Sequence, residues 1–245
     1  MRPLIHPPIL AIIVVSALNC ATASNAQKPI VGDEARRFAQ QFGDCSVERN
    51  PIDAKSVVLT PVELTEVQER FPKLLTYHCF AGSRPNDPSY LRLPYPSLYL
   101  ILSEALIRRE FAETGPSDIA GRPAMAPIFY KEATEEELDR MSKQERLEYS
   151  TVKADVAGWQ ILQKLGLCVA RSAPDTVRRL ALTMVATKAE SELLAELRPA
   201  VARCIPPDTS IRLKSADVRS VSALGYYRLA HASSASDAAA AKVTR

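Results

Sequence analysis

Glycine is scarce in this sequence, and its scarcity excludes several kinds of nucleotide site. The 245 residues include 8 glycines, and the closest pair, Gly115 and Gly121, is six residues apart. Glycine-rich phosphate loops and dinucleotide-binding turns need glycines closer together than this. We therefore expect no nucleotide cofactor. The 18 prolines instead favour helices interrupted by proline over a glycine-rich sandwich or barrel.

Histidine is equally rare, and catalytic or metal-binding motifs are missing from the sequence. The three histidines are His6, His78 and His231, and His6 lies in a segment that we expect to be removed. The chain has no His-Glu-x-x-His, no Gly-x-Ser-x-Gly and no Cys-x-x-Cys motif. Zinc sites, serine hydrolase elbows and redox dithiols are recognised by such patterns. We predict no metal and no redox centre.

Strong charge of either sign is also lacking. The formal net charge is +3, and the basic residues are scattered along the chain. Nucleic-acid binders carry dense basic patches, and membrane-surface helices carry a basic amphipathic face. We therefore predict no nucleic-acid partner, and attachment to a membrane surface is disfavoured.

The N-terminus has the features of a signal peptide. Ile9 to Leu18 is an apolar run of ten residues, which is the length of a signal-peptide core and short for a membrane span. Small residues suited to cleavage follow at Ala23 and Ala26. We predict that residues 1–26 are removed, that the protein is periplasmic or secreted, and that no transmembrane segment remains.

Four cysteines remain after this removal: Cys45, Cys79, Cys168 and Cys204. An even number of cysteines in an exported chain favours disulfide bonds. The sequence allows three pairings. We expect Cys45–Cys79 and Cys168–Cys204, because the two intervals are similar in length and the surrounding residues repeat.

This repetition predicts two related halves. Gly43 and Cys45 match Gly166 and Cys168, each 123 residues later, and Arg108 matches Arg228 at 120 residues. Ordered matches with a slowly drifting interval indicate an internal repeat. The predicted organisation is a first repeat at 30–111, a linker at 112–133, a second repeat at 134–231 and a disordered tail at 232–245.

Both halves have the sequence pattern of helices, so we predict an all-α fold in which the repeats are able to share one core. The run 98–107 is apolar nearly all round and predicts a buried central helix, which the last helix, 218–229, matches. Pro72 and Pro199 should kink the helices that contain them. Trp159 is expected to anchor the core. The residues expected to cap helices are Asp33, Asn50, Thr60, Thr134, Ser142, Ser172 and Thr187.

The repeat has a recognisable plan: a cysteine after an apolar helix, a proline six residues later, and a second cysteine about 35 residues away. This plan resembles uncharacterised exported proteins of alphaproteobacteria. The resemblance implies a bacterial envelope setting and implies no activity, cofactor or catalytic residue.

Glu104 is the one candidate for acid–base chemistry, because it lies in the apolar run. Burial favours the protonated form of a carboxyl group, which could then act as a general acid. A structural ion pair with Arg108, four residues later, is the interpretation that we favour. The matching position in the second half is Leu224, so the repeat supplies no second carboxylate there.

The absence of catalytic motifs favours a non-catalytic interaction or scaffold protein, whose partner would be an envelope protein or a peptide. Duplicated helical units often present a groove between them. Tyr95, Tyr99, Tyr226 and Tyr227 are candidates to line such a groove, although tyrosines on these helices are more often core residues. The alternative function is a carboxylate-dependent hydrolase that acts on a glycan or a peptide.

Overall fold

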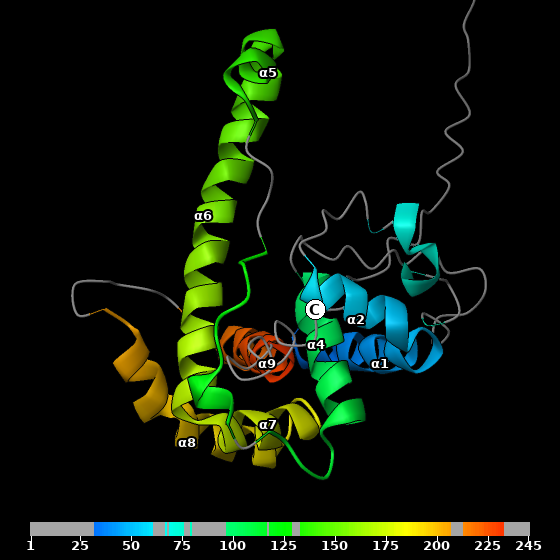
Figure 1. Cartoon of the computed structure of the whole chain (residues 1–245), viewed down its shortest axis with the longest axis vertical. Helices are drawn as coiled ribbons and strands as arrows, with labels where there is room; N and C mark the ends of the chain where they lie inside the picture. The colour runs from blue at the N-terminus through cyan, green and yellow to red at the C-terminus, as the bar shows by residue number, and fades with distance from the viewer. Residues whose placement is uncertain are drawn as a thin grey trace, which may run out of the picture.

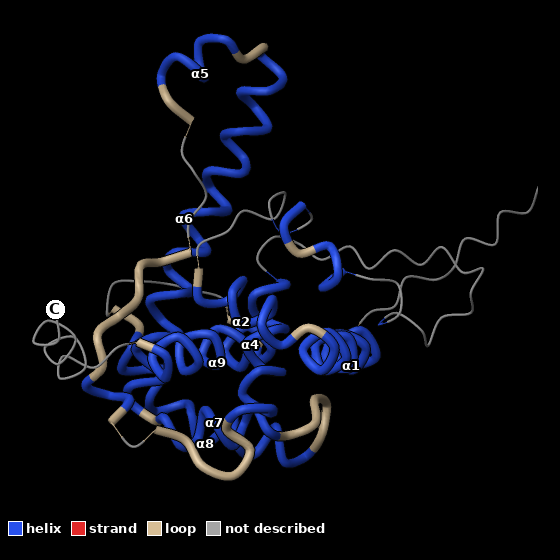
Figure 2. Tube along the Cα trace, turned by 45° about the vertical axis from the view of Figure 1, so that its right-hand side comes forward, coloured by secondary structure: helices blue, strands red, loops and turns tan. Residues whose placement is uncertain are grey.

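The computed structural model describes residues 32–60, 67, 69–75, 79, 97–116, 118–128, 133–206 and 213–232. Every regular element in this part of the chain is helical (Figure 2), which confirms the predicted all-α class. The predicted signal peptide, His78, Tyr95 and residues 233–245 of the predicted tail lie outside the described residues.

The helices fall into two sets that follow each other along the chain (Figure 1). The first set is α1 (Asp33–Arg49), α2 (Pro51–Leu59), the 3₁₀ turn η1 (Pro72–Leu75) and α4 (Ser97–Glu110). The second set is η3 (Ile119–Gly121), α5 (Glu135–Arg140), α6 (Lys143–Ser172), α7 (Pro174–Leu182), α8 (Lys188–Cys204) and α9 (Ser215–His231).

Proline separates the first two helices of each half in the same way. Asn50 (φ −136°, ψ 61°) stands between α1 and α2, and Ala173 (φ −149°, ψ 57°) stands between α6 and α7. Each of them precedes a proline, and the proline ring disfavours helical geometry at the residue before it. The prediction that Ser172 caps the next helix is therefore wrong, because Ser172 is the last residue of α6 and Ala173 occupies the cap position.

The other predicted helix starts agree with the structure to different degrees. Thr134 and Ser142 form complete capping boxes with Glu137 and Glu145, as predicted. Thr187 caps α8 by accepting a hydrogen bond from the Glu190 amide. One prediction needs correction, because Asp33 is the first residue inside α1 and Gly32 is its cap. Thr60 is the C-cap of α2, and the start of the helix that it was predicted to cap, residues 61–66, lies outside the described residues.

The two prolines expected to kink helices behave differently. Pro72 opens η1, and the helical turn before it ends at Arg70. Pro199 lies inside α8, which continues to Cys204. A proline lacks the amide proton that a helix interior needs. In the first half the chain changes to a 3₁₀ turn at the proline, and in the second half the helix continues past it.

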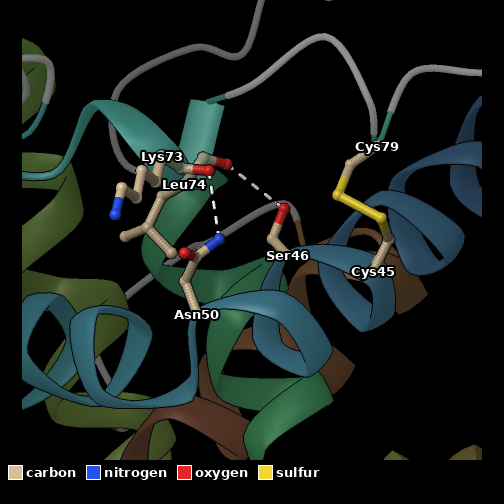
Figure 3. The surroundings of a disulfide bond; sticks show 6 residues. All are labelled: Cys45, Ser46, Asn50, Lys73, Leu74 and Cys79. Carbon is tan, nitrogen blue, oxygen red and sulfur yellow. Dashed lines mark hydrogen bonds between the residues drawn. A yellow bond between two sulfur atoms is a disulfide. The ribbon is translucent and has the colours of Figure 1, made fainter.

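The structure contains the two predicted disulfide bonds. Cys45 of α1 is joined to Cys79, and Cys168 of α6 is joined to Cys204, with Cα–Cα distances of 5.5 and 5.8 Å. Beside the first bond, the Ser46 hydroxyl and the Asn50 amide donate hydrogen bonds to the carbonyls of Leu74 and Lys73 (Figure 3). The two hydrogen bonds hold η1 against the C-terminal part of α1, and the disulfide joins Cys79 to the same helix.

Equivalent helices of the two halves make equivalent contacts. Helix α1 packs on α4 as α6 packs on α9, and α2 packs on α4 as α7 packs on α9. The central helices α4 and α9 also pack against each other, and each contacts the short helix of the opposite half. Buried hydrophobic residues of both halves belong to one cluster.

Glycines at matching positions allow the closest helix crossings. A Cβ atom on Gly43 of α1 would lie 2.6 Å from the Ile101 side chain of α4, and one on Gly166 of α6 would lie 2.0 Å from the Val221 carbonyl oxygen of α9. Ile101 and Val221 are themselves equivalent, at the interval of 120 residues. In both halves, the lack of a side chain on glycine thus allows the short distance between the two crossing helices.

Helix α6 has an extension that the first half lacks. Its last 17 residues match α1, whereas the residues before them, together with α5, form an arm that projects away from the other helices (Figure 1). Helix α5 has no buried residue, and Leu147 on α6 is 61% exposed. Trp159, which is 4% exposed, is a core residue, as predicted. In the described part of the chain, no helix combines the length and hydropathy of a membrane span.

The tight crossing of α6 and α9 predicts a large difference between two glycine substitutions in the same helix. Gly166→Ala should lower the free energy of unfolding by at least about 2 kcal/mol, because the new methyl group meets backbone atoms. Gly158→Ala, which meets nothing within 4 Å, should raise it by about 0.5–1 kcal/mol. Urea unfolding followed by circular dichroism measures both changes. Equal effects of the two substitutions would contradict the crossing.

Candidate functional site

Two pockets occupy equivalent places in the two halves. The first pocket has a volume of ≈ 90 Å³, and Gln40 of α1 and Arg108 of α4 are among its lining residues. The second has a volume of ≈ 360 Å³, and the equivalent residues Gln163 of α6 and Arg228 of α9 line it. The internal repeat therefore extends to the cavities between the helices.

The two arginines bind opposite halves in a reciprocal way. Arg108 donates from Nη1 to the carbonyl oxygen of Ala181 at 2.9 Å, and Arg228 donates from Nη1 to the carbonyl oxygen of Val58 at 2.8 Å. Ala181 and Val58 are the last residues but one of α7 and α2. Each arginine thus binds the C-terminal end of the other half's short helix, where a cation is favoured. Reciprocal contacts of this kind are what a twofold relation produces.

The two glutamines each hold a backbone segment over their pocket. Gln40 donates to the Thr183 carbonyl at 3.1 Å and accepts from the Val185 amide at 3.0 Å. Gln163 donates to the Ile128 carbonyl at 2.6 Å and accepts from the Ile128 amide at 2.9 Å. Ile128 ends a segment, residues 122–128, that we call the strap. It lies in the predicted linker and supplies Ala124, Met125 and Pro127 to the second pocket.

The first pocket contains Glu104, and this carboxylate is engaged at both oxygens. Its Oε2 accepts a hydrogen bond from Nε of Arg219 at 2.8 Å, and its Oε1 accepts one from the Ser220 hydroxyl at 2.6 Å. Arg108, the partner expected from the sequence, is farther away, with Nη1 at 3.8 Å from Oε2. A structural ion pair is therefore present at Glu104, but Arg219 is its main partner.

Arg219 connects Glu104 to a second buried carboxylate. The Arg219 side chain is 1% exposed, and it also contacts Glu190 at 3.1 Å and the Thr183 carbonyl at 2.9 Å. Glu190 pairs in turn with Arg36 and accepts a hydrogen bond from the Ala186 amide at 2.8 Å. This last contact steadies a turn in which Ala186 has a left-handed φ of 56°.

The charges around the first pocket balance within the chain. Asp44 accepts a hydrogen bond from Nε of Arg108 at 2.7 Å. The three arginines of the network, Arg36, Arg108 and Arg219, thus each contact at least one of the carboxylates of Asp44, Glu104 and Glu190, and Arg36 also contacts the exposed carboxylate of Asp33 at 3.4 Å. Buried charges are tolerated when they are paired in this way. The first pocket needs no further ion.

The second pocket lacks these carboxylates. Leu167 stands at the position equivalent to Asp44, and Leu224 at the position equivalent to Glu104, and both leucines line the pocket. Arg228 is only 6% exposed, and its Nη2 donates to the carbonyl of Ala126 in the strap. Desolvation lowers the pKa of Arg228 to about 10, opposed in part by nearby Tyr99. Among the described residues, no carboxylate pairs with Arg228.

The three described tyrosines among those predicted to line a groove are core residues. Tyr99, Tyr226 and Tyr227 are between 0 and 1% exposed, because α4 and α9 are covered on nearly every side. Burial raises the pKa of Tyr226 to about 12. The structure therefore matches the alternative interpretation, in which these rings fill the space between helices.

His231 belongs to a cluster that the sequence did not reveal. Its Nε2 lies 2.8 Å from Oε2 of Glu110, whose carboxylate also accepts from the Tyr227 hydroxyl at 3.0 Å and contacts Lys55 at 3.3 Å. Burial lowers the pKa of His231, so the neutral ring is favoured. The cluster joins the end of α4 to the end of α9 and to α2.

Neither metal clusters nor known relatives add a further candidate. In the parts of the chain that the structure describes, no group of three or more histidine, cysteine, aspartate or glutamate side chains is placed to hold a metal ion. No protein-family model, no curated protein and no solved structure matches the chain.

The buried network predicts a strong effect of removing Arg219. Arg219→Met should lower the free energy of unfolding by about 3–5 kcal/mol, because it leaves Glu104 and Glu190 in the interior without their shared cation. Arg140→Ala is the matched control. It removes an arginine from an exposed pair with Glu136 and should change stability by less than about 0.5 kcal/mol. Urea unfolding compares them, and similar effects would contradict the network.

Proposed function

We propose that the protein is an exported, non-catalytic binding protein of the bacterial envelope, and that its ligand occupies the second pocket. One observation carries the proposal. The two equivalent pockets differ in size and charge. The first is small, and carboxylates of the chain neutralise its arginines, whereas the second is larger, mostly apolar and positively charged at Arg228. A cavity of this kind suits a ligand that comes from outside the chain.

The size and lining of the second pocket favour a small ligand over a peptide. Ligand pockets typically have volumes of about 300–1,000 Å³, apolar walls and a few placed polar groups. The second pocket, at ≈ 360 Å³, has apolar walls that include Met125, Leu167 and Leu224. Gln163 and Arg228 supply polar groups. A volume near the lower limit favours a compact molecule.

Export is supported by the disulfides together with the predicted signal peptide. Disulfide bonds persist in oxidising compartments such as the bacterial periplasm and are rare in the cytosol. Both pairs join segments within one half, at separations of 34 and 36 residues. Such bonds stabilise the folded protein by restricting the unfolded chain.

The alternative of a carboxylate-dependent hydrolase receives less support. Its candidate acid, Glu104, uses both oxygens to bind Arg219 and Ser220, and the adjacent pocket has a volume of only ≈ 90 Å³. A glycan or peptide needs a longer cleft than this volume provides.

Docking of an envelope protein is a second proposal, and the arm favours it. No residue of α5 is buried, residues 143–147 at the start of α6 are exposed, and neither segment has a counterpart in the first half. A contact on this arm is compatible with a ligand in the second pocket, because the strap lies at the other end of α6.

Native mass spectrometry of the protein purified from its export compartment tests the binding function. We expect the parent protein to carry a small molecule. Leu167→Trp, which fills the pocket, should lose it. Ile161→Trp, at a position on the same helix that is 49% exposed and outside the pocket lining, should keep it.

The comparison of these variants decides the proposal. An adduct in all three proteins would place the ligand elsewhere, and an adduct in none would contradict a small-molecule binding function. Circular dichroism of each variant checks that both tryptophan proteins remain helical.

A further inference from the structure

The first pocket shows how the chain pairs the charge of Arg108, the arginine at the position equivalent to Arg228. Arg108 binds one helix end through Nη1 and directs Nε to Asp44 at 2.7 Å, with Glu104 at 3.8 Å from Nη1. Two carboxylates thus stand beside the guanidinium, one from α1 and one from α4. The arrangement is a template, within the same molecule, for what surrounds the equivalent Arg228.

The second pocket keeps the arginine and replaces both carboxylates with leucine. Arg228 binds the end of α2 and the Ala126 carbonyl, but its Nε, the atom equivalent to the one that binds Asp44, donates to no residue in the described ranges. A buried charge is costly unless it is paired. Leu167 and Leu224, which stand where the carboxylates would be, both line the open volume.

We propose that the second pocket binds a small monocarboxylate with an apolar body, and that Arg228 pairs with the carboxylate as Arg108 pairs with Asp44. The proposal rests on the proposed binding function and names its ligand class. The hydrocarbon part would lie against Leu167, Leu224 and Met125.

The lining of the pocket favours one negative charge over two. Phosphate groups and dicarboxylates need several donors. Two amide side chains line the pocket: Gln163 already uses its amide to hold Ile128, and Gln160 carries no charge. Lys164 lines the pocket but is exposed, so water screens its charge. Arg228 alone therefore provides a buried positive charge for the ligand.

Calorimetric titration of the solvent-extracted, exported form of the full protein tests this ligand class. The probes are octanoate and 1-octanol, which share a chain and differ in the head group. Octanoate should bind with one-to-one stoichiometry and at least about tenfold more tightly than octanol, because a charge-assisted pair forms only with the acid.

Two variants locate the pairing. Arg228→Met should reduce octanoate affinity to that of octanol and leave octanol affinity unchanged. Leu167→Asp, which supplies a carboxylate of the chain's own, should abolish octanoate binding, whereas Leu167→Asn should retain it. The second comparison remains decisive if Arg228→Met proves to be poorly folded.

The outcomes separate this inference from the proposed function. Equal affinity for octanoate and octanol, or equal effects of the aspartate and asparagine variants, would overturn the monocarboxylate inference while leaving a binding protein. A natural adduct that is not a carboxylic acid would do the same. An absence of binding by either probe, together with an absence of any natural adduct, would overturn both.

Discussion

The reciprocal contact between an arginine of each central helix and the end of the opposite short helix is the constraint on which the architecture depends. Arg108 reaches Ala181 and Arg228 reaches Val58, so the order of helices in one half determines where the other half can dock. The contact needs α4 and α9 to lie side by side, which in turn buries them almost completely. The buried charge network and the two pockets both form around these arginines.

Comparison of the two halves distinguishes the residues that maintain the architecture, which are the same in both, from the residues that differ between the two pockets. The glycines at the crossings, the pocket glutamines, the arginines and the cysteines correspond in both halves. At two pocket positions an acid in the first half is a leucine in the second: Asp44 corresponds to Leu167, and Glu104 to Leu224. Because the scaffold is shared, the difference in pocket chemistry follows from these few side chains and from the strap that covers only the second pocket.

The sequence predicted the features that local patterns and the repeat encode. Helical class, both disulfides, the burial of Trp159 and the capping boxes at Thr134 and Ser142 follow from short-range signals. The main partner of Glu104 was missed because Arg219 is 115 residues away in the chain. Helical spacing in the sequence indicates only partners on the same helix, such as Arg108 four residues later. The described tyrosines line no groove, because their burial depends on how many helices surround them, and local sequence patterns do not show this number. The second pocket was not predicted either, although the replacement of Glu104 by Leu224 in the repeat was the available signal.

The most direct test of this account compares the removal of the two equivalent arginines in ligand-free protein. Arg108→Met and Arg228→Met each break a bond to the opposite half, but only the first also removes a partner of carboxylates of the chain, those of Asp44 and, at 3.8 Å, Glu104. The account predicts that Arg108→Met lowers the free energy of unfolding in urea more than Arg228→Met does, by about 1–3 kcal/mol. A cost for Arg228→Met that equals or exceeds that for Arg108→Met would show that Arg228 is already satisfied within the chain, and would contradict the account.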